Sequence, residues 1–164
     1  MYETIMWFTK GSSYTFNLDP IRIPQKYPGK KYSRGPRAGQ YSGNPLGKNP
    51  SDVWDIPNVK ANHVEKTSHP CQFPIVIPQK LIKCLTSEGD IVVDPFFGSG
   101  TTAVACVIEN RRFIGAEIQK SYFEIAKERV MNSLEGDIKY RPDVPVVEPD
   151  KNLKVAQKPE GFKW

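Results

Sequence analysis

The stretch "IVVDPFFGSGTT", residues 91–102, decides which fold this 164-residue chain adopts. It opens with a short apolar run, which predicts a buried strand that ends at Asp94. Gly98 and Gly100 follow, and glycines let the backbone turn sharply and approach a ligand closely. A helix is expected to begin directly after them. Because ligands of open α/β sheets bind at the carboxyl ends of the strands, Asp94 and this turn are candidates for a binding site.

The segments around this turn alternate between helical and strand patterns. They are expected to be helix 78–89, strand 90–94, helix 100–110, strand 112–118 and helix 122–134. Pro78 suits the first position of its helix, and Ser121 with Glu124 forms a capping box before the last one. The order helix–strand–helix–strand–helix predicts an α/β fold with a parallel sheet and right-handed crossovers.

The residue types at the turn restrict the ligand. Neither G-x-G-x-x-G nor Gly-Lys-Thr occurs here, so the fingerprints of nicotinamide, flavin and ATP P-loop sites are missing. Asp94 has the wrong charge for a pyrophosphate and the right charge for a cationic ligand. Glu117, at the end of the next predicted strand, is placed to accept both ribose hydroxyls of a nucleoside. S-adenosylmethionine, with a sulfonium, an amino acid end and an adenosine, fits both acids. The alternative is a tight turn that binds nothing.

Residues 92–130 resemble the cofactor-binding segment of the DNA methyltransferases that modify exocyclic amino groups, the adenine-N6 and cytosine-N4 enzymes. The family motif D-P-F-x-G-S-G-T-T is present without departure at residues 94–102. Gly115, Glu117 and Tyr122 match the G-x-E and tyrosine that follow it. Residues 69–90 resemble the segment that precedes the cofactor strand in the β motif order. Residues 44–70 resemble the variable target-recognition region.

The resemblance implies a partial Rossmann-like methyltransferase sheet, without its N-terminal strands, and S-adenosylmethionine as the cofactor. Phe73 and Pro74 are implied to lie beside the methionine end of that cofactor. The implied cofactor-binding residues are Phe73, Pro74, Asp94, Pro95, Phe96, Gly98, Ser99, Gly100, Thr101, Thr102, Glu117 and Tyr122.

The family's catalytic tetrapeptide, [D/N/S]-P-P-[Y/F], does not occur in the chain. Residues 94–97 lack the second proline, and residues 19–22 lack the second proline and the aromatic. No catalytic residue is therefore assigned. Three interpretations follow: one part of a split enzyme whose partner chain carries the motif, a truncated product, or a DNA- or cofactor-binding remnant without catalysis. Adenine is favoured over cytosine as the target on the frequency of the two activities in the family.

The net charge of +5 is concentrated in one interval. Between Asp19 and Asp52 there is no acidic residue, and tyrosines are interleaved with the bases. A field of one sign attracts polyanions, which predicts contact with double-stranded DNA. The candidates for this contact are Lys26, Lys30, Lys31, Arg34, Arg37, Asn44 and Lys48. Base edges are expected to meet Asn44, Asn49 or Asn62 and Arg34 or Arg37. A solvated basic loop without a partner is the alternative.

The division of the chain follows from composition. Residues 1–16 are expected to hold a sheet strand at 3–9, residues 17–70 the target-recognition region, residues 71–135 the cofactor-binding segment, and residues 136–164 a poorly ordered tail or surface arm. Three cysteines without a C-x-x-C pair and two histidines predict reduced thiols and no metal site. No apolar run reaches 18 residues and no signal peptide opens the chain, so no membrane span and a cytoplasmic location are expected.

Overall fold

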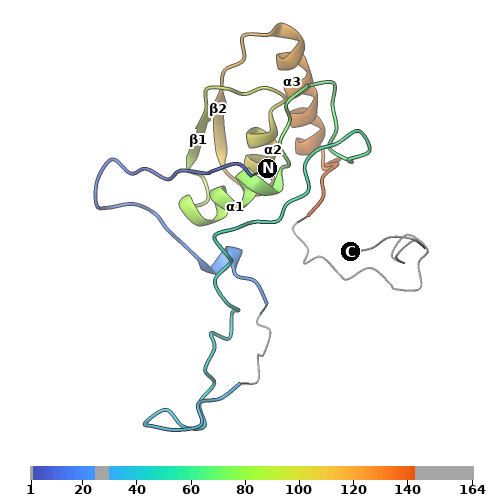
Figure 1. Ribbon diagram of the computed structural model, residues 1–164. Helices are drawn as coiled ribbons and strands as arrows, with labels where there is room; N and C mark the ends of the chain where they lie inside the picture. Colours follow the sequence, from blue (N-terminus) through green and yellow to red (C-terminus); the bar gives the residue numbers. More distant parts are fainter. Residues whose placement is uncertain (1, 25–29, 143–164) are drawn as a thin grey trace, which may run out of the picture.

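The computed structural model describes residues 2–24 and 30–142 of the chain (Figure 1). Its elements are η1 (Asp19–Ile21), α1 (Val76–Leu85), β1 (Ile91–Asp94), α2 (Thr101–Ile108), β2 (Arg112–Gly115) and α3 (Lys120–Leu134). From α1 onward this is the helix–strand alternation that the sequence predicts. The mixed α/β class with a partial parallel sheet is confirmed.

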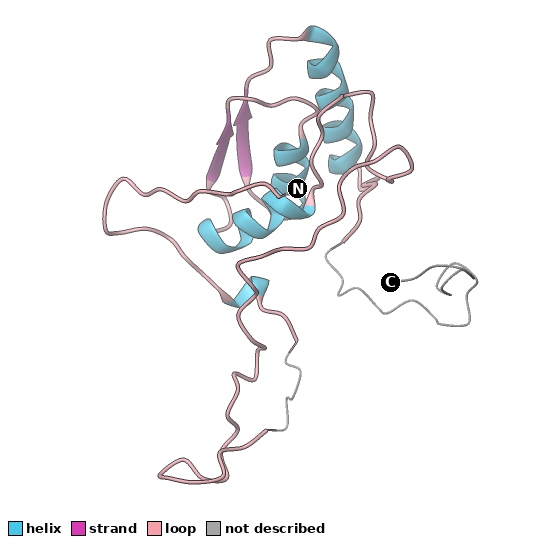
Figure 2. Ribbon diagram, viewed as in Figure 1, coloured by secondary structure: helices cyan, strands magenta, loops and turns pink. Residues whose placement is uncertain are grey.

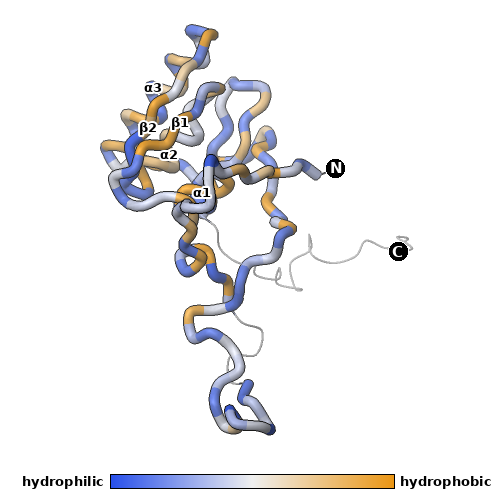
Figure 3. The backbone as a smooth tube through the Cα atoms, turned by 90° about the vertical axis from the view of Figure 1, so that its left-hand side faces the viewer, coloured by the Kyte–Doolittle hydropathy of each residue, from blue (hydrophilic) through white to orange (hydrophobic). Residues whose placement is uncertain are grey.

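β1 and β2 form a parallel pair in which Ile91 lies opposite Arg112 and Asp94 lies opposite Gly115. The carboxyl ends of both strands therefore meet at one edge. Side chains alternate across the pair: Val92 and Phe113 pack against the core, whereas Ile91, Val93 and Ile114 are exposed. The helices gather on one side of the strands, as Figure 2 shows. Figure 3 views the strands from their other side, and its orange stretches mark their apolar residues.

The core is built around α2, which contacts α1, α3 and β2. Ala103, Val104, Ala105 and Cys106 are at most 2% exposed, so this helix is buried around nearly its whole circumference. The next two apolar residues of the helix, Val107 and Ile108, are only half-buried. Small side chains explain the difference, because alanines let neighbouring elements approach from several directions.

Two helices begin earlier than predicted. α1 starts at Val76, so Pro78 occupies the third position of its first turn, where no intrahelical N–H bond is lost. α3 starts at Lys120 with Gln119 as its N-cap and no side-chain cap bond, so the predicted capping box is wrong. Ser121 already lies inside the first helical turn of α3.

Both ends of the described chain differ from expectation. The strand predicted over residues 3–9 is not formed, because β1 and β2 pair only with each other among the described residues. The segment is exposed instead, and Trp7 contacts the rings of Tyr14 and Phe16. At the other end, residues 136–142 are not a free arm, since Ile138 and Tyr140 pack against the core. Residues 143–164 lie outside the described part.

The basic region projects from the core as an arm, by which we mean residues 22–24 and 30–49 (Figure 1). At its base, Ile23 and Lys48 exchange backbone hydrogen bonds of 3.0 and 2.9 Å. Nearer its tip, Lys31 and Tyr41 form a second antiparallel bridge. Gly47 has a φ of +111°, and a Cβ there would lie 2.6 Å from the Ile23 carbonyl oxygen, so the base of the arm requires this glycine.

Candidate functional site

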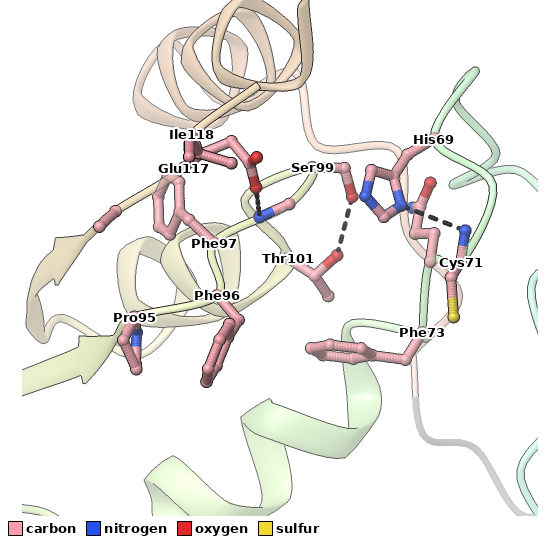
Figure 4. A pocket seen from close by; sticks show the side chains of 13 residues that line it. His69, Cys71, Phe73, Pro95, Phe96, Phe97, Ser99, Thr101, Glu117 and Ile118 are labelled. Carbon is pink, nitrogen blue, oxygen red and sulfur yellow. Dashed lines mark hydrogen bonds between the residues drawn. The ribbon is translucent and has the colours of Figure 1, made fainter. Parts of the chain in front are cut away.

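A pocket of about 590 Å³ lies at the edge where β1 and β2 end. Its volume is in the range of small-molecule sites. Of the predicted cofactor residues, those that line it are Phe73, Pro95, Phe96, Gly98, Ser99, Thr101 and Glu117. Those that do not are Pro74, Asp94, Gly100, Thr102 and Tyr122. The segments around 73, 94–102 and 117 are therefore brought together, as the sequence indicates (Figure 4).

The glycine turn, residues 98–100, depends on its two glycines. Gly98 and Gly100 have φ values of +52° and +74°, a region that other residues seldom adopt. A Cβ on Gly100 would lie 2.9 Å from the Cβ of Ala126, so this glycine lets α2 approach α3 closely. A Cβ on Gly98 would lie 3.2 Å from Nε2 of His69, on the pocket side. Gly100 thus serves helix packing, and Gly98 leaves room for the His69 ring at the pocket wall.

Glu117 joins the end of β2 to the glycine turn. Its Oε2 accepts a hydrogen bond from the Gly98 N–H at 2.8 Å, and its Oε1 accepts one from the Gln119 N–H at 2.8 Å. The hydrogen bond from Gln119 is the largest cause that lowers the pKa of Glu117. Desolvation raises this pKa, but the hydrogen bond from Gly98 and the nearby His69 lower it further. The carboxylate is therefore ionised at neutral pH. Each oxygen has a second lone pair with which to accept a bond from a ligand.

Asp94 is the last residue of β1, as predicted. Its Oδ1 accepts a hydrogen bond from the Phe96 N–H at 3.0 Å, which fixes the chain as it leaves the strand. The side chain is half-buried and does not line the pocket. Its predicted charge contact with a ligand stays a prediction.

Arg129, on α3, supports the glycine turn from behind, and the sequence analysis missed it. Its Nη1 donates to the Ser99 carbonyl oxygen at 2.6 Å, to Ser99 Oγ at 3.0 Å and to Thr101 Oγ1 at 3.1 Å. Burial lowers the pKa of Arg129, and Glu65 opposes that shift. Both hydroxyls are thus already engaged by the protein. An arginine among the charged residues of α3 resembles a solvated surface residue, so the sequence offered no signal.

The opposite wall of the pocket comes from residues 65–73, a loop held by side-chain hydrogen bonds. Gln72 accepts from the Thr67 N–H at 3.1 Å and from its hydroxyl at 2.8 Å, and it donates to the Glu65 carbonyl at 2.7 Å. The buried Glu65 carboxylate accepts from the Ile75 N–H at 2.8 Å. His69, Cys71 and Gln72 join the pocket lining in this way, although the sequence analysis assigned none of them to the cofactor.

The described DNA-contact candidates are exposed, and all of them except Asn62 lie on the arm. Lys26 lies outside the described residues. Arg37 stacks over the ring of Tyr32 at 4.6 Å, and Lys31 lies 5.0 Å from the ring of Tyr41. Asn44 Oδ1 accepts from the Leu46 N–H, which makes it a turn residue. The arm therefore keeps Lys30, Lys31, Arg34, Arg37 and Lys48 on its surface and uses at least one of its amides to hold its own shape.

Within residues 2–24 and 30–142, no helix is long and apolar enough to cross a membrane. The same residues contain no cluster of histidine, cysteine and acidic side chains that could hold a metal ion. Cys71, Cys84 and Cys106 are free thiols, as predicted.

Comparisons with known proteins identify the family of the chain. The sequence model of the N6/N4 methylase family, described as DNA methylase, matches residues 1–128. The type II methyltransferase M.BglII of Bacillus subtilis is 53% identical over 125 residues, which are 76% of this chain and 35% of that protein. The DNA adenine methyltransferase YhdJ of Escherichia coli (strain K12) is 34% identical over 131 residues, 79% of this chain and 45% of YhdJ.

Among solved structures, the crystal structure of an M1.HpyAVI–SAM complex shares 46% sequence identity with this chain. The match has a TM-score of 0.41 and covers 43% of this chain and 35% of that one. The chain thus spans less than half the length of each of these relatives.

Proposed function

Because the chain belongs to the N6/N4 DNA methylase family, we propose that it forms the cofactor-binding and target-recognition part of a site-specific DNA methyltransferase. The reaction is the transfer of a methyl group from S-adenosylmethionine to the exocyclic amine of adenine, N6. The observation that carries this proposal is the pocket at the carboxyl ends of β1 and β2, with Glu117 bonded to the glycine turn.

The residues of the pocket fit S-adenosylmethionine. An ionised carboxylate at the end of β2 suits the two hydroxyls of a ribose, and its free lone pairs can accept from both. Phe73 and Phe96, which lie on the same side of the pocket in Figure 4, offer apolar surface to an adenine ring or a methylene chain. When bound, the cofactor supplies an electrophilic methyl group on its sulfonium.

The arm is proposed to contact DNA. The arm exposes basic side chains and no acidic ones between Asp19 and Asp52, namely Lys30, Lys31, Arg34, Arg37 and Lys48. Contacts of such side chains with phosphates set the position of a protein on the duplex. Tyrosine contacts orient two of these cations. The arm and the pocket belong to separate parts of the chain, which matches a division between recognition and cofactor binding.

We propose that catalysis needs groups from outside this sequence. The target amine must be desolvated and held in line with the methyl carbon, and an acid or amide with a proline carbonyl accepts its hydrogens. The catalytic tetrapeptide is absent from all 164 residues. We propose that a separate N-terminal methyltransferase segment or subunit provides it. A non-catalytic DNA- or cofactor-binding module is the alternative from a different functional class.

Adenine is the proposed target because YhdJ, a DNA adenine methyltransferase by name, matches 79% of this chain. Cytosine-N4 methylation is the second candidate. Digestion of methylated DNA to nucleosides and mass spectrometry separates the two products.

The test of the cofactor assignment is calorimetric titration of the chain with S-adenosylmethionine. Saturable binding is expected, and Asp94→Ala is expected to abolish it. Normal binding by Asp94→Ala would refute the charge argument for Asp94. Absence of binding by the unmodified chain, with or without the proposed partner, would refute the cofactor assignment itself.

A further inference from the structure

We propose that Glu65 is a positioning residue for the cofactor pocket, because its carboxylate fastens the pocket loop, residues 65–73, to a strap formed by residues 136–142. The inference rests on the proposed cofactor and concerns a residue that does not itself line the pocket. Glu65 is 3% exposed, and it is the only acidic side chain that is buried among residues 2–24 and 30–142. Burial of a carboxylate is costly unless it is hydrogen-bonded, so its partners show what it holds.

The two carboxylate oxygens of Glu65 bind backbone donors from segments that are far apart in sequence. Oε2 accepts the N–H of Ile75, directly before α1, at 2.8 Å. Oε1 accepts the N–H of Arg141, which lies in the strap 76 residues further along, at 3.1 Å. Hydrogen bonds to an ionised acceptor are stronger than those between neutral groups. One buried side chain therefore joins the pocket loop, α1 and the strap.

The strap is held along its length. It leaves α3 at Gly136, which has a φ of +87° and donates its N–H to the Ser133 carbonyl oxygen at 3.2 Å. It then runs from the end of α3 toward the pocket loop (Figure 1), and Ile138 and Tyr140 pack against the core on the way. The strap therefore reaches Glu65 in a defined position.

Glu65 acts on both walls of the pocket. In the pocket loop, its carbonyl oxygen accepts from Gln72 Nε2 at 2.7 Å, and Gln72 lines the pocket. On the side of the glycine turn, Arg129 donates to Ser99 and Thr101. Burial lowers the pKa of Arg129, and the negative charge of Glu65 opposes this shift, so it favours the cation that holds the turn. Loss of the carboxylate is therefore expected to loosen the loop and the turn together.

The experiment measures the Kd for S-adenosylmethionine and the free energy of unfolding in the unmodified chain and in four variants. Glu65→Gln removes the charge and one of the two acceptor oxygens. Arg141→Pro removes the N–H that the strap donates, whereas Arg141→Ala keeps this N–H and removes only the side chain. Cys84→Ala leaves a cavity at a buried position of α1 outside the pocket lining, and it is the control for loss of stability alone.

Glu65→Gln is expected to raise the Kd about tenfold, the size of one hydrogen bond to a charged group, because the ligand must then order the pocket. Arg141→Pro is expected to raise it about threefold, within the range of a single hydrogen bond, and Arg141→Ala to leave it unchanged. Cys84→Ala is expected to lower the free energy of unfolding without changing the Kd, because a chain that stays folded keeps its binding-competent population.

Three results would count against these expectations. No rise in the Kd for Glu65→Gln, or an equal rise for Cys84→Ala, would overturn the positioning role of Glu65. Equal effects of the two Arg141 variants would overturn the role of the strap. If the unmodified chain does not bind S-adenosylmethionine, the proposed cofactor itself is refuted, and the role of Glu65 is refuted with it.

A second measurement uses the unmodified chain and does not depend on the variants folding. Coupling is reciprocal, so a ligand in the pocket must stabilise the strap by as much free energy as the strap contributes to binding. S-adenosylmethionine is therefore expected to slow hydrogen exchange of the Arg141 amide more than that of the Gly89 amide. Gly89 donates to the Asn110 carbonyl oxygen ahead of β1, at the end remote from the pocket. Equal slowing of the two amides would contradict the coupling.

Discussion

At the scale of single residues, the pocket depends on two side chains that hold the backbone of the turn. On the ligand side, Glu117 accepts hydrogen bonds from the backbone N–H groups of Gly98 and Gln119. On the α3 side, Arg129 donates hydrogen bonds to Ser99 and Thr101. The turn is therefore held between an anion and a cation before any ligand arrives. Preorganisation of this kind reduces the entropy lost on binding.

The pH dependence of stability tests the role of Glu117. Its pKa is lowered from 4.5 in the folded chain, so the stability it contributes is complete above pH 4.5 and is lost as the pH falls through the lowered pKa. Urea denaturation of the chain and of Glu117→Gln between pH 3 and pH 7 measures this, and the two curves of free energy against pH are expected to converge in acid. Glu124→Gln, at an exposed position of α3, is the control and should follow the unmodified chain. Parallel curves for the chain and Glu117→Gln would contradict the assignment.

Glu117 and Arg129 also show what sequence reasoning can reach. Glu117 was predictable because it follows an apolar strand and completes a motif with the glycine turn. Arg129 was not, because its role depends on the rotation of α3 that brings it onto Ser99 and Thr101. His69, which lines the pocket, was missed for the same reason, since Tyr122 and Gly98, between which its ring lies, are remote in sequence.

At the scale of elements, the approach of α2 to α3 depends on Gly100. A Cβ at this residue would meet Ala126 at 2.9 Å, in addition to the strain of a positive φ. Gly100→Ala is expected to lower the free energy of unfolding by about 2 kcal/mol more than Gly89→Ala, because misplaced atoms in a packed core cost about 1–3 kcal/mol. Gly89 has a φ of +80° and no atom near its Cβ position, so it carries the strain alone. Equal losses in urea denaturation would show that the helix contact is unimportant.

The arm is expected to bind DNA through its charge. Arg34→Ala and Arg37→Ala should each weaken binding to duplexes of any sequence and reduce the slope of log K against log salt by about one, the value for one lost phosphate contact. Fluorescence anisotropy at several salt concentrations measures this slope. Lys127→Ala, which removes an exposed cation of α3, is the matched control. An unchanged slope for both arm variants would exclude phosphate contact by these two residues.

Element boundaries were less predictable than element types. The alternation of helix and strand follows from the apolar pattern, and the structure agrees. α1 starts directly after Ile75, whose N–H is bonded to Glu65, and α3 starts directly after Gln119, whose N–H is bonded to Glu117. These bonds, rather than Pro78 and Ser121, mark the starts of the two helices. The strand expected at residues 3–9 has suitable residue types, but a strand also requires a neighbour with free backbone groups, which a local pattern does not reveal.

At the scale of the whole molecule, one face of the two-stranded sheet is left uncovered by residues 2–24 and 30–142. Val93 is 63% exposed and Ile114 is 58% exposed, whereas parallel sheets are normally covered on both faces. The complementary catalytic segment proposed above is expected to supply that cover. We therefore expect no methyl transfer to DNA by the chain alone.

Transfer is expected when the chain is co-expressed with the part of M.BglII that it does not match, since the two proteins are 53% identical where they align. The assay follows label from S-adenosylmethionine into DNA. Val93→Lys should lower the yield by placing a charge on the uncovered face, and Lys127→Ala should not. Transfer by the chain alone would show that it contains a catalytic group outside the known tetrapeptide.

The way the arm is attached has a consequence for engineering. Its two ends, Ile23 and Lys48, are hydrogen-bonded to each other, and closing a loop between adjacent ends costs little extra free energy as the loop changes length. A different loop could therefore be grafted between these two residues without disturbing the pocket. Sequence preference would then become an exchangeable module, which could be selected from a library while one cofactor site is retained.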